Sequence, residues 1–114
     1  AKKKEGRVIL MASYYGTEEG TPNFLAPYVS TKSAVLGLMR SLAKEYGPKN
    51  LKINAMAPDL TDTKFLDEMP QIMKDTVAQN SERGRMLSAD EVADVMLRYL
   101  DVDLEENGKT VVIK

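Results

Sequence analysis

Apolar residues along the chain fall into short continuous runs and longer stretches in which they recur every three or four positions. The run from Val8 to Ala12 is continuously apolar, which is typical of a strand that is buried on both faces. A second run, Leu51 to Ala57, is interrupted by two polar residues and closed by Pro58. A third, Thr110 to Ile113, follows the turn-forming pair at 107–108. The sequence therefore predicts three strands.

The first periodic stretch predicts a helix from Pro27 to about Tyr46. Proline suits the first turn of a helix, where its missing N–H would have no partner. Gly47 and Pro48 are expected to end the helix, with Gly47 in a left-handed cap. The periodic apolar positions are Val35, Leu38, Met39 and Leu42.

The second periodic stretch predicts a helix from Ala89 to about Leu100. Ser88 and Glu91 have the spacing of a capping box. The apolar stripe behind them is Val92, Val95, Met96 and Tyr99. The elements then follow in the order strand, helix, strand, helix, strand. Because helical crossovers join parallel strands, we expect one α/β domain over residues 1–114 with a parallel β-α-β-α-β sheet.

Two segments lack a clear period. Residues 13–27 are crowded with turn formers, and a loop of about 15 residues is long enough to suggest function. Residues 61–81 suggest one or two short helices broken at Pro70.

Composition narrows the possible chemistry. The 114 residues include 43% apolar and 29% charged side chains, as in ordinary globular proteins, and the formal net charge of −1 argues against nucleic-acid and membrane partners. The absence of cysteine and histidine excludes disulfides, zinc sites of the usual kind and Ser-His-Asp or Cys-His catalysis. We expect no metal, no transmembrane segment and no signal peptide, and we expect a cytoplasmic location.

The pair Tyr28 and Lys32 is the first candidate for chemistry. Four residues apart on a helix, the two side chains share a face, with about 6 Å of rise between them. A phenol has a reference pKa of about 10, so it becomes a useful acid or base near neutral pH only when a cation stabilises its phenolate. Lys32 is placed to do so. The alternative is that Tyr28 packs, Lys32 is solvated and the spacing is accidental.

Polar residues also follow two of the predicted strands. Ser13 comes directly after the first strand, and Thr61 and Thr63 follow the second one. Open α/β sheets place ligands at the carboxyl ends of their parallel strands. These side chains and the start of the helix with Tyr28 are therefore expected to meet at one edge of the sheet.

Several motifs together resemble the C-terminal half of the short-chain dehydrogenase/reductase family. They are VILMASYYG at 8–16, YVSTK at 28–32, the helix SAVLGLMRSLAKEYGPK at 33–49, INAMAP at 53–58, and the segments GRM at 84–86 and EVA at 91–93. The resemblance covers nearly the whole chain. It implies a three-layer, Rossmann-like arrangement that is part of a complete Rossmann fold.

The resemblance also implies roles for individual residues. Tyr28 would be the catalytic acid/base, and Lys32 would hold the nicotinamide ribose and favour the phenolate. Ser13 would bind the substrate oxygen, with Tyr15 beside it. The reaction implied is hydride transfer between NAD or NADP and a small alcohol or carbonyl substrate.

Further residues are implied in binding. Pro58, Thr61 and Thr63 match the family segment that touches the nicotinamide. Phe65 and Leu66, with Met69 and Met73, would line the substrate site, although core packing of a short helix is an equal alternative. Asp59 departs from the family, which usually has glycine after this proline.

Other family features have no counterpart in the sequence. Glycine occurs at 6, 16, 20, 37, 47, 84 and 108, so no glycine-rich turn can hold a pyrophosphate. The family's catalytic asparagine is also missing. Two hypotheses follow. The chain is the C-terminal portion of an NAD(P)-dependent oxidoreductase, or it is a freestanding, non-catalytic half-domain that self-associates.

The isolated chain is expected to self-associate. The family pattern places its three strands side by side in sequence order and leaves the strand at 8–12 without a neighbour on one side, so that N–H and C=O groups are exposed there with almost no charge to discourage partners. The helix from Tyr28 to Tyr46 adds an apolar face. We expect the isolated chain to be a dimer or larger, paired through this strand, this helix or both.

Overall fold

A computed structural model describes residues 5–23, 25–59, 61–62, 71–72, 75, 87–101 and 103–114 of the chain. The strands are β1 (Gly6–Met11), β2 (Leu51–Pro58), β3 (Thr61–Asp62), β4 (Leu87–Ser88) and β5 (Thr110–Ile113). The α-helices are α1 (Ala26–Tyr46) and α3 (Ala89–Arg98), and short 3₁₀ helices cover Tyr14–Gly16 and Gly47–Lys49. The predicted strands and helices are thus confirmed, with ends that shift by up to two residues.

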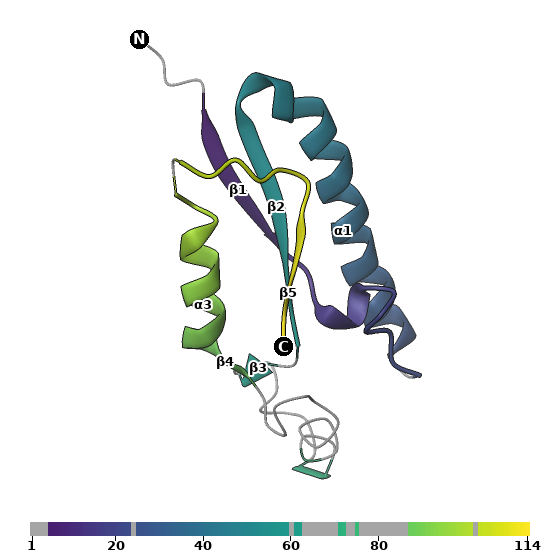
Figure 1. Cartoon of the computed structure of the whole chain (residues 1–114). Helices are drawn as coiled ribbons and strands as arrows, with labels where there is room; N and C mark the ends of the chain where they lie inside the picture. Colours follow the sequence, from purple (N-terminus) through teal and green to yellow (C-terminus); the bar gives the residue numbers. More distant parts are fainter. Residues whose placement is uncertain are drawn as a thin grey trace.

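The main sheet has three strands in the order β1-β2-β5, and both pairings are parallel. In this register Gly6 lies opposite Leu51, and Pro58 lies opposite Ile113. Helix α1 lies along one face of the sheet and α3 along the other (Figure 1). The predicted α/β fold with three layers is therefore confirmed. A second, two-stranded parallel ladder of β3 and β4 was not expected from the sequence.

Two apolar clusters fill the two spaces between the layers. On the α1 side, Met39 and Ala43 pack with Ile53 and Ala55. On the α3 side, Met56, Val92 and Ile113 are among the buried side chains. Alternate residues of β2 thus serve opposite faces, so the strand is buried on both.

Strand β1 corrects one expectation. Its residues were expected to be buried on both faces, but they are only partly buried, and Met11 is 41% exposed. The reason is its place in the sheet, because β1 pairs with β2 on one side and lies at the edge of the described strands. An apolar run therefore predicted the strand correctly but not its burial within this chain.

The helix ends confirm one expectation and correct another. Ser88 and Glu91 form both hydrogen bonds of the predicted capping box. Gly47, however, has a right-handed conformation with φ of −52°, and the left-handed residue is Asn50, with φ of 64°. Glycine at position 47 instead allows the side chain of Asn107 to pack closely against the backbone. A Cβ at this position would lie 2.5 Å from the side-chain nitrogen of Asn107.

Two asparagines fix the segment that leads into β5. Asn107 accepts a hydrogen bond from the Ile53 amide at 2.8 Å and donates one to the Ala43 carbonyl at 3.0 Å. The fully buried Asn54 donates to the Glu106 carbonyl at 3.1 Å and accepts from the Lys109 amide at 3.0 Å. These bonds connect α1, β2 and the loop before β5, and so hold the sheet in register.

The remaining expectations concern membranes and the middle of the chain. Among the described residues, no helix has the length and apolar character needed to cross a bilayer. Gln71, Ile72 and Asp75 are helical, in agreement with the short helices expected between 61 and 81. The rest of that prediction, including Pro70, lies outside the described residues.

Candidate active site

Tyr28 and Lys32 lie together in the first turns of α1. The ammonium nitrogen of Lys32 is 5.7 Å from the centroid of the Tyr28 ring, and both residues are half-buried. The shared face predicted from the spacing is therefore confirmed. The lysine cation thus lies over the face of the phenol ring, and its action on a phenolate stays a prediction.

The turn after β1 brings Ser13 to the same helix. Ser13 is 7% exposed, and its hydroxyl accepts a hydrogen bond from the Tyr15 amide at 3.1 Å, which fixes the 3₁₀ turn that begins at Tyr14. The turn ends against α1, where the Ser33 hydroxyl donates to the Gly16 carbonyl at 2.9 Å. Ser13 and Tyr15 are thus carried by a short turn that is attached one residue beyond Lys32.

Gly16 makes this attachment possible. A Cβ added to Gly16 would lie 2.8 Å from the backbone carbon and the Cβ of Lys32. These atoms belong to a helix backbone that cannot move away. The close approach of the turn to α1 therefore requires glycine at this position.

Replacing Gly16 by alanine should push the turn away from α1 and displace Ser13. We expect a loss of roughly 1–3 kcal/mol in the free energy of unfolding, as for other overpacked sites, measured by urea denaturation. The matched control is Gly37→Ala in the middle of α1, where the nearest atom, Arg40 Nη2, is 3.7 Å from the added Cβ. Equal stability of the two variants would contradict the role of Gly16.

The end of β2 lies at the same edge of the sheet. The Ala12 amide donates to the Met56 carbonyl at 2.8 Å, and the Asp59 amide donates to the Ile113 carbonyl at 2.7 Å. Ser13 and Asp59 therefore each follow a strand at the carboxyl edge, as predicted for this fold. Pro58 is the last residue of β2 and is half-buried.

The other expected binding residues are only partly described. The backbone of Thr61 pairs with Leu87 in the small ladder of β3 and β4. Thr63, Phe65 and Leu66 lie outside the described residues, as do Met69 and Met73. Their binding roles stay predictions.

Tyr15, at this edge of the sheet, has a raised pKa. Burial raises the pKa of its phenol above the ordinary value of 10.0, and the negative charges of Asp59 and of ionised Tyr28 raise the pKa further. Tyr15 therefore stays protonated at neutral pH and can donate a hydrogen bond. These effects on Tyr15 come from residues that are distant in the sequence, so sequence patterns do not reveal them.

A second contact holds the outer part of the loop. Lys114 Nζ lies 2.9 Å from Glu19 Oε1 and 5.4 Å from the centroid of the Tyr14 ring. The hydrogen bond from Lys114 is the largest cause that lowers the pKa of Glu19, followed by the Lys114 charge. Because Glu19 is largely exposed, the pair contributes little to stability, but it links the loop to the end of β5.

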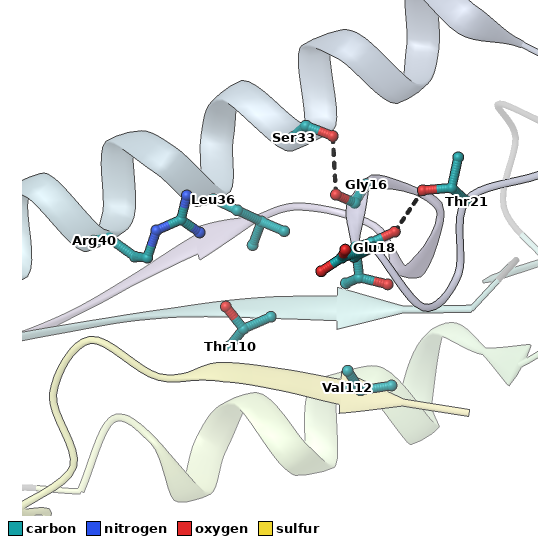
Figure 2. A pocket seen from close by; sticks show the side chains of 9 residues that line it. Gly16, Glu18, Thr21, Ser33, Leu36, Arg40, Thr110 and Val112 are labelled. Carbon is teal, nitrogen blue, oxygen red and sulfur yellow. Dashed lines mark hydrogen bonds between the residues drawn. The ribbon is translucent and has the colours of Figure 1, made fainter.

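A cavity of about 620 Å³ lies between this loop, α1 and β5. Its lining residues are Gly16, Thr17, Glu18, Thr21, Ser33, Leu36, Arg40, Thr110 and Val112. Figure 2 shows Arg40 and Leu36 on the helix above Thr110 and Val112 of β5, with Glu18 on the loop. Ser13, Tyr28 and Lys32 do not line it, so the cavity is separate from the candidate catalytic groups.

The donor set at the sheet edge fits one half of a nicotinamide cofactor. Lys32 supplies an ammonium group, Tyr28 a phenolic hydroxyl and Ser13 an alcoholic hydroxyl. These groups can bind ribose hydroxyls and a carbonyl oxygen. This sequence contains no glycine-rich turn that could bind the pyrophosphate of the cofactor. Within the described residues no group of acidic side chains could hold a metal ion.

Comparison with known proteins gives consistent results. The family model described as Enoyl-(Acyl carrier protein) reductase matches residues 1–106. The 3-oxoacyl-(acyl-carrier-protein) reductase FabG of Thermotoga maritima is 29% identical over 96 residues, which are 84% of this chain and 38% of that protein. Dehydrogenase/reductase SDR family member 4 of Sus scrofa is 30% identical over an alignment of 115 positions, which covers 98% of this chain and 41% of that protein. The chain thus spans about two fifths of the length of these relatives.

Solved structures agree on the fold. The 3-oxoacyl-(acyl-carrier protein) reductase of Brucella melitensis superposes with a TM-score of 0.79 at 28% identity, over 92% of this chain and 39% of that one. A gluconate 5-dehydrogenase of Burkholderia cenocepacia, solved with NADP and tartrate, has a TM-score of 0.86 at 20% identity, over 97% of this chain and 44% of that one. The second likeness supports the fold alone.

Proposed function

The chain belongs to the short-chain dehydrogenase/reductase family, and we propose that it is the catalytic, C-terminal portion of an NAD(P)-dependent oxidoreductase. Its reaction interconverts an alcohol and a carbonyl by hydride transfer. The observation that carries the proposal is the position of the Lys32 ammonium over the Tyr28 ring, 5.7 Å from its centroid. This pair lies on the helix to which the turn with Ser13 is attached.

Tyr28, Lys32 and Ser13 have distinct tasks in this proposal. Tyr28 gives its phenolic proton to the carbonyl oxygen as the alcohol forms, and takes it back in the reverse direction. Lys32 holds the cofactor ribose and stabilises the phenolate with its charge. Ser13 positions the substrate oxygen, and the tight turn fixed by the Tyr15 amide keeps its side chain in place.

The nicotinamide group supplies or accepts the hydride when it is bound. The proposed contacts on the nicotinamide side of the cofactor are Lys32, Pro58, Thr61 and Thr63. A relative named 2-dehydro-3-deoxy-L-rhamnonate dehydrogenase (NAD(+)), 35% identical over 88 residues, supports a nicotinamide cofactor. The other half of the dinucleotide would be held by a glycine-rich turn in the rest of the protein, so the 114 residues alone should bind NAD or NADP weakly.

The proposal is tested on the complete protein that contains this chain. We expect it to oxidise NADH or NADPH only when a small ketone or aldehyde is added, as followed by the loss of nicotinamide absorbance. A mixture without the carbonyl compound is the control. A lack of carbonyl-dependent oxidation across linear, cyclic and hydroxylated ketones, with either cofactor, would contradict the proposed activity.

A second candidate function is self-association without catalysis. Within the described residues β1 pairs along one side only, and Met11 and Leu38 are 41% and 53% exposed. These features favour pairing of two copies through β1 or α1. The proposed cytoplasmic location stays a prediction. Sedimentation of the 114-residue chain should give at least a dimer, whereas a stable 12.7 kDa monomer would contradict this.

A further inference from the structure

The hydroxyl of Thr17 holds together two consecutive turns of the loop that follows β1. It donates a hydrogen bond to the Tyr14 carbonyl at 2.6 Å and accepts one from the Gly20 amide at 3.0 Å. The Thr17 amide donates to the same Tyr14 carbonyl at 3.1 Å. This one side chain thus closes the 3₁₀ turn that begins at Tyr14 and fixes the start of the next turn.

Gly20 packs directly against the first of these turns. A Cβ added to Gly20 would collide with the carbonyl oxygen of Tyr14 and would lie 2.9 Å from its carbonyl carbon. Backbone atoms of this kind cannot move aside as the end of a flexible side chain can. The two turns are therefore packed closely around the Tyr14 carbonyl, and the hydroxyl of Thr17 is bonded to both of them.

The closed turn also sets the position of the Ser13 side chain. The Gly16 amide donates to the Ser13 carbonyl at 2.9 Å, and the Tyr15 amide donates to the Ser13 hydroxyl at 3.1 Å. Among the described residues the Ser13 hydroxyl donates to none, so its proton is available to a substrate oxygen. Figure 2 shows the bond from Ser33 that attaches the end of the turn, at Gly16, to α1. The orientation of Ser13 therefore depends on the turn being closed.

Resting on the proposed function, we propose that Thr17 is a positioning residue for the reaction. It acts through Ser13, because it keeps closed the turn whose Tyr15 amide binds the Ser13 hydroxyl. A displacement of about 1 Å in such a group is enough to lower a rate by about 100-fold. The role differs from that of Gly16, which allows the turn to approach α1.

The variant Thr17→Val tests this role because it replaces the hydroxyl by a methyl group of similar size. We expect kcat of the complete protein to fall by about 10–100-fold. The KM for the cofactor should stay within about twofold of the parent, because Tyr28 and Lys32 keep their places on α1. The variant Thr17→Ser restores the hydroxyl and should return kcat to within about threefold of the parent.

Thr21→Val is the matched control in the same loop. The Thr21 hydroxyl donates to the Thr17 carbonyl at 2.7 Å, and its side chain is exposed. The control therefore removes one loop hydroxyl and one hydrogen bond without opening the turn that carries Ser13. Its kcat should match that of the parent.

A Ser13→Ala background separates positioning from stability alone. In this background the group that Thr17 positions is absent, so adding Thr17→Val should lower the residual kcat by less than about twofold. A merely structural role would lower kcat by the same factor in both backgrounds. The four proteins of this cycle are compared at saturating substrate and cofactor.

Hydrogen exchange of the Tyr15 amide tests the same contact without turnover. In the parent this amide is bonded to Ser13, so it exchanges when the turn opens. We expect Thr17→Val to speed the exchange roughly three- to tenfold, the effect of losing one hydrogen bond. Thr21→Val should leave the exchange rate unchanged. The measurement is nuclear magnetic resonance of the complete protein labelled with ¹⁵N-tyrosine.

Three results would overturn the positioning role. They are a parental kcat in Thr17→Val, an equal loss of kcat with and without Ser13, and a parental exchange rate of the Tyr15 amide in Thr17→Val. Failure of the proposed catalysis would look different. The parent protein would then lack carbonyl-dependent turnover while Thr17→Val still sped the exchange, so the contact would stand and its role in the reaction would fall with the activity.

Discussion

Replacing Tyr28 by phenylalanine in the complete protein should lower kcat by about 10²–10⁴-fold, the usual contribution of a positioned acid or base. The change removes one oxygen and keeps the ring over which the Lys32 ammonium lies. The fold and cofactor binding should therefore stay close to those of the parent. The measurement is the rate of carbonyl reduction at saturating cofactor and substrate, together with the unfolding transition.

The same helix offers a matched control for this substitution. Tyr46 lies at the other end of α1, and Lys49 Nζ is 5.3 Å from the centroid of its ring. Tyr46→Phe removes the same oxygen from a similar tyrosine and lysine pair that is far from Ser13. Its kcat should match the parent. A parental rate in Tyr28→Phe would remove Tyr28 from the role of acid/base.

Replacing Asn54 by alanine should lower the free energy of unfolding by about 3 kcal/mol. Asn54 is fully buried, and its loss leaves the Glu106 carbonyl and the Lys109 amide without their side-chain partner. Each such unsatisfied group costs roughly 1–3 kcal/mol. Urea denaturation of the complete protein measures the change.

The control for Asn54 is Asn23→Ala in the exposed loop before α1, which should change the free energy of unfolding by less than about 0.5 kcal/mol. If Asn54→Ala were as stable as this control, the loop before β5 would have to be held by other contacts. The asparagine in the INAMAP motif would then have no structural role.

Much of the architecture could be predicted from the sequence because it depends on local patterns. The period of its apolar residues predicts α1, the apolar run closed by Pro58 predicts β2, and the capping box of Ser88 and Glu91 predicts the start of α3. The shared face of Tyr28 and Lys32 follows from helix geometry alone. The parallel direction of the strands follows from the helical crossovers between them.

Other features depend on contacts between distant segments and could not be predicted in this way. The role of Gly16 is set by its approach to Lys32, and that of Gly47 by its contact with Asn107. Both glycines look like ordinary turn residues in the sequence. The effect of Asp59 on the pKa of Tyr15 connects residues that follow two different strands, so only the folded chain reveals it.

The expectation that β1 is buried on both faces was wrong for a different reason. An apolar run predicts that a strand is covered somewhere, but not by which chain or segment. Among the described strands only β2 pairs with β1, and the half-buried residues of β1 reflect that single strand neighbour.

The transfer of deuterium from reduced nicotinamide to product tests the central claim most directly. The complete protein is given NADH or NADPH with deuterium at both positions of the hydride-donating carbon, together with a ketone that it reduces. The alcohol is analysed by mass spectrometry. The account predicts one deuterium on the new carbinol carbon, at a rate that falls by about 10²–10⁴-fold in Tyr28→Phe and is unchanged in Tyr46→Phe. Alcohol without deuterium, or equal rates of transfer in the parent and Tyr28→Phe, would contradict it.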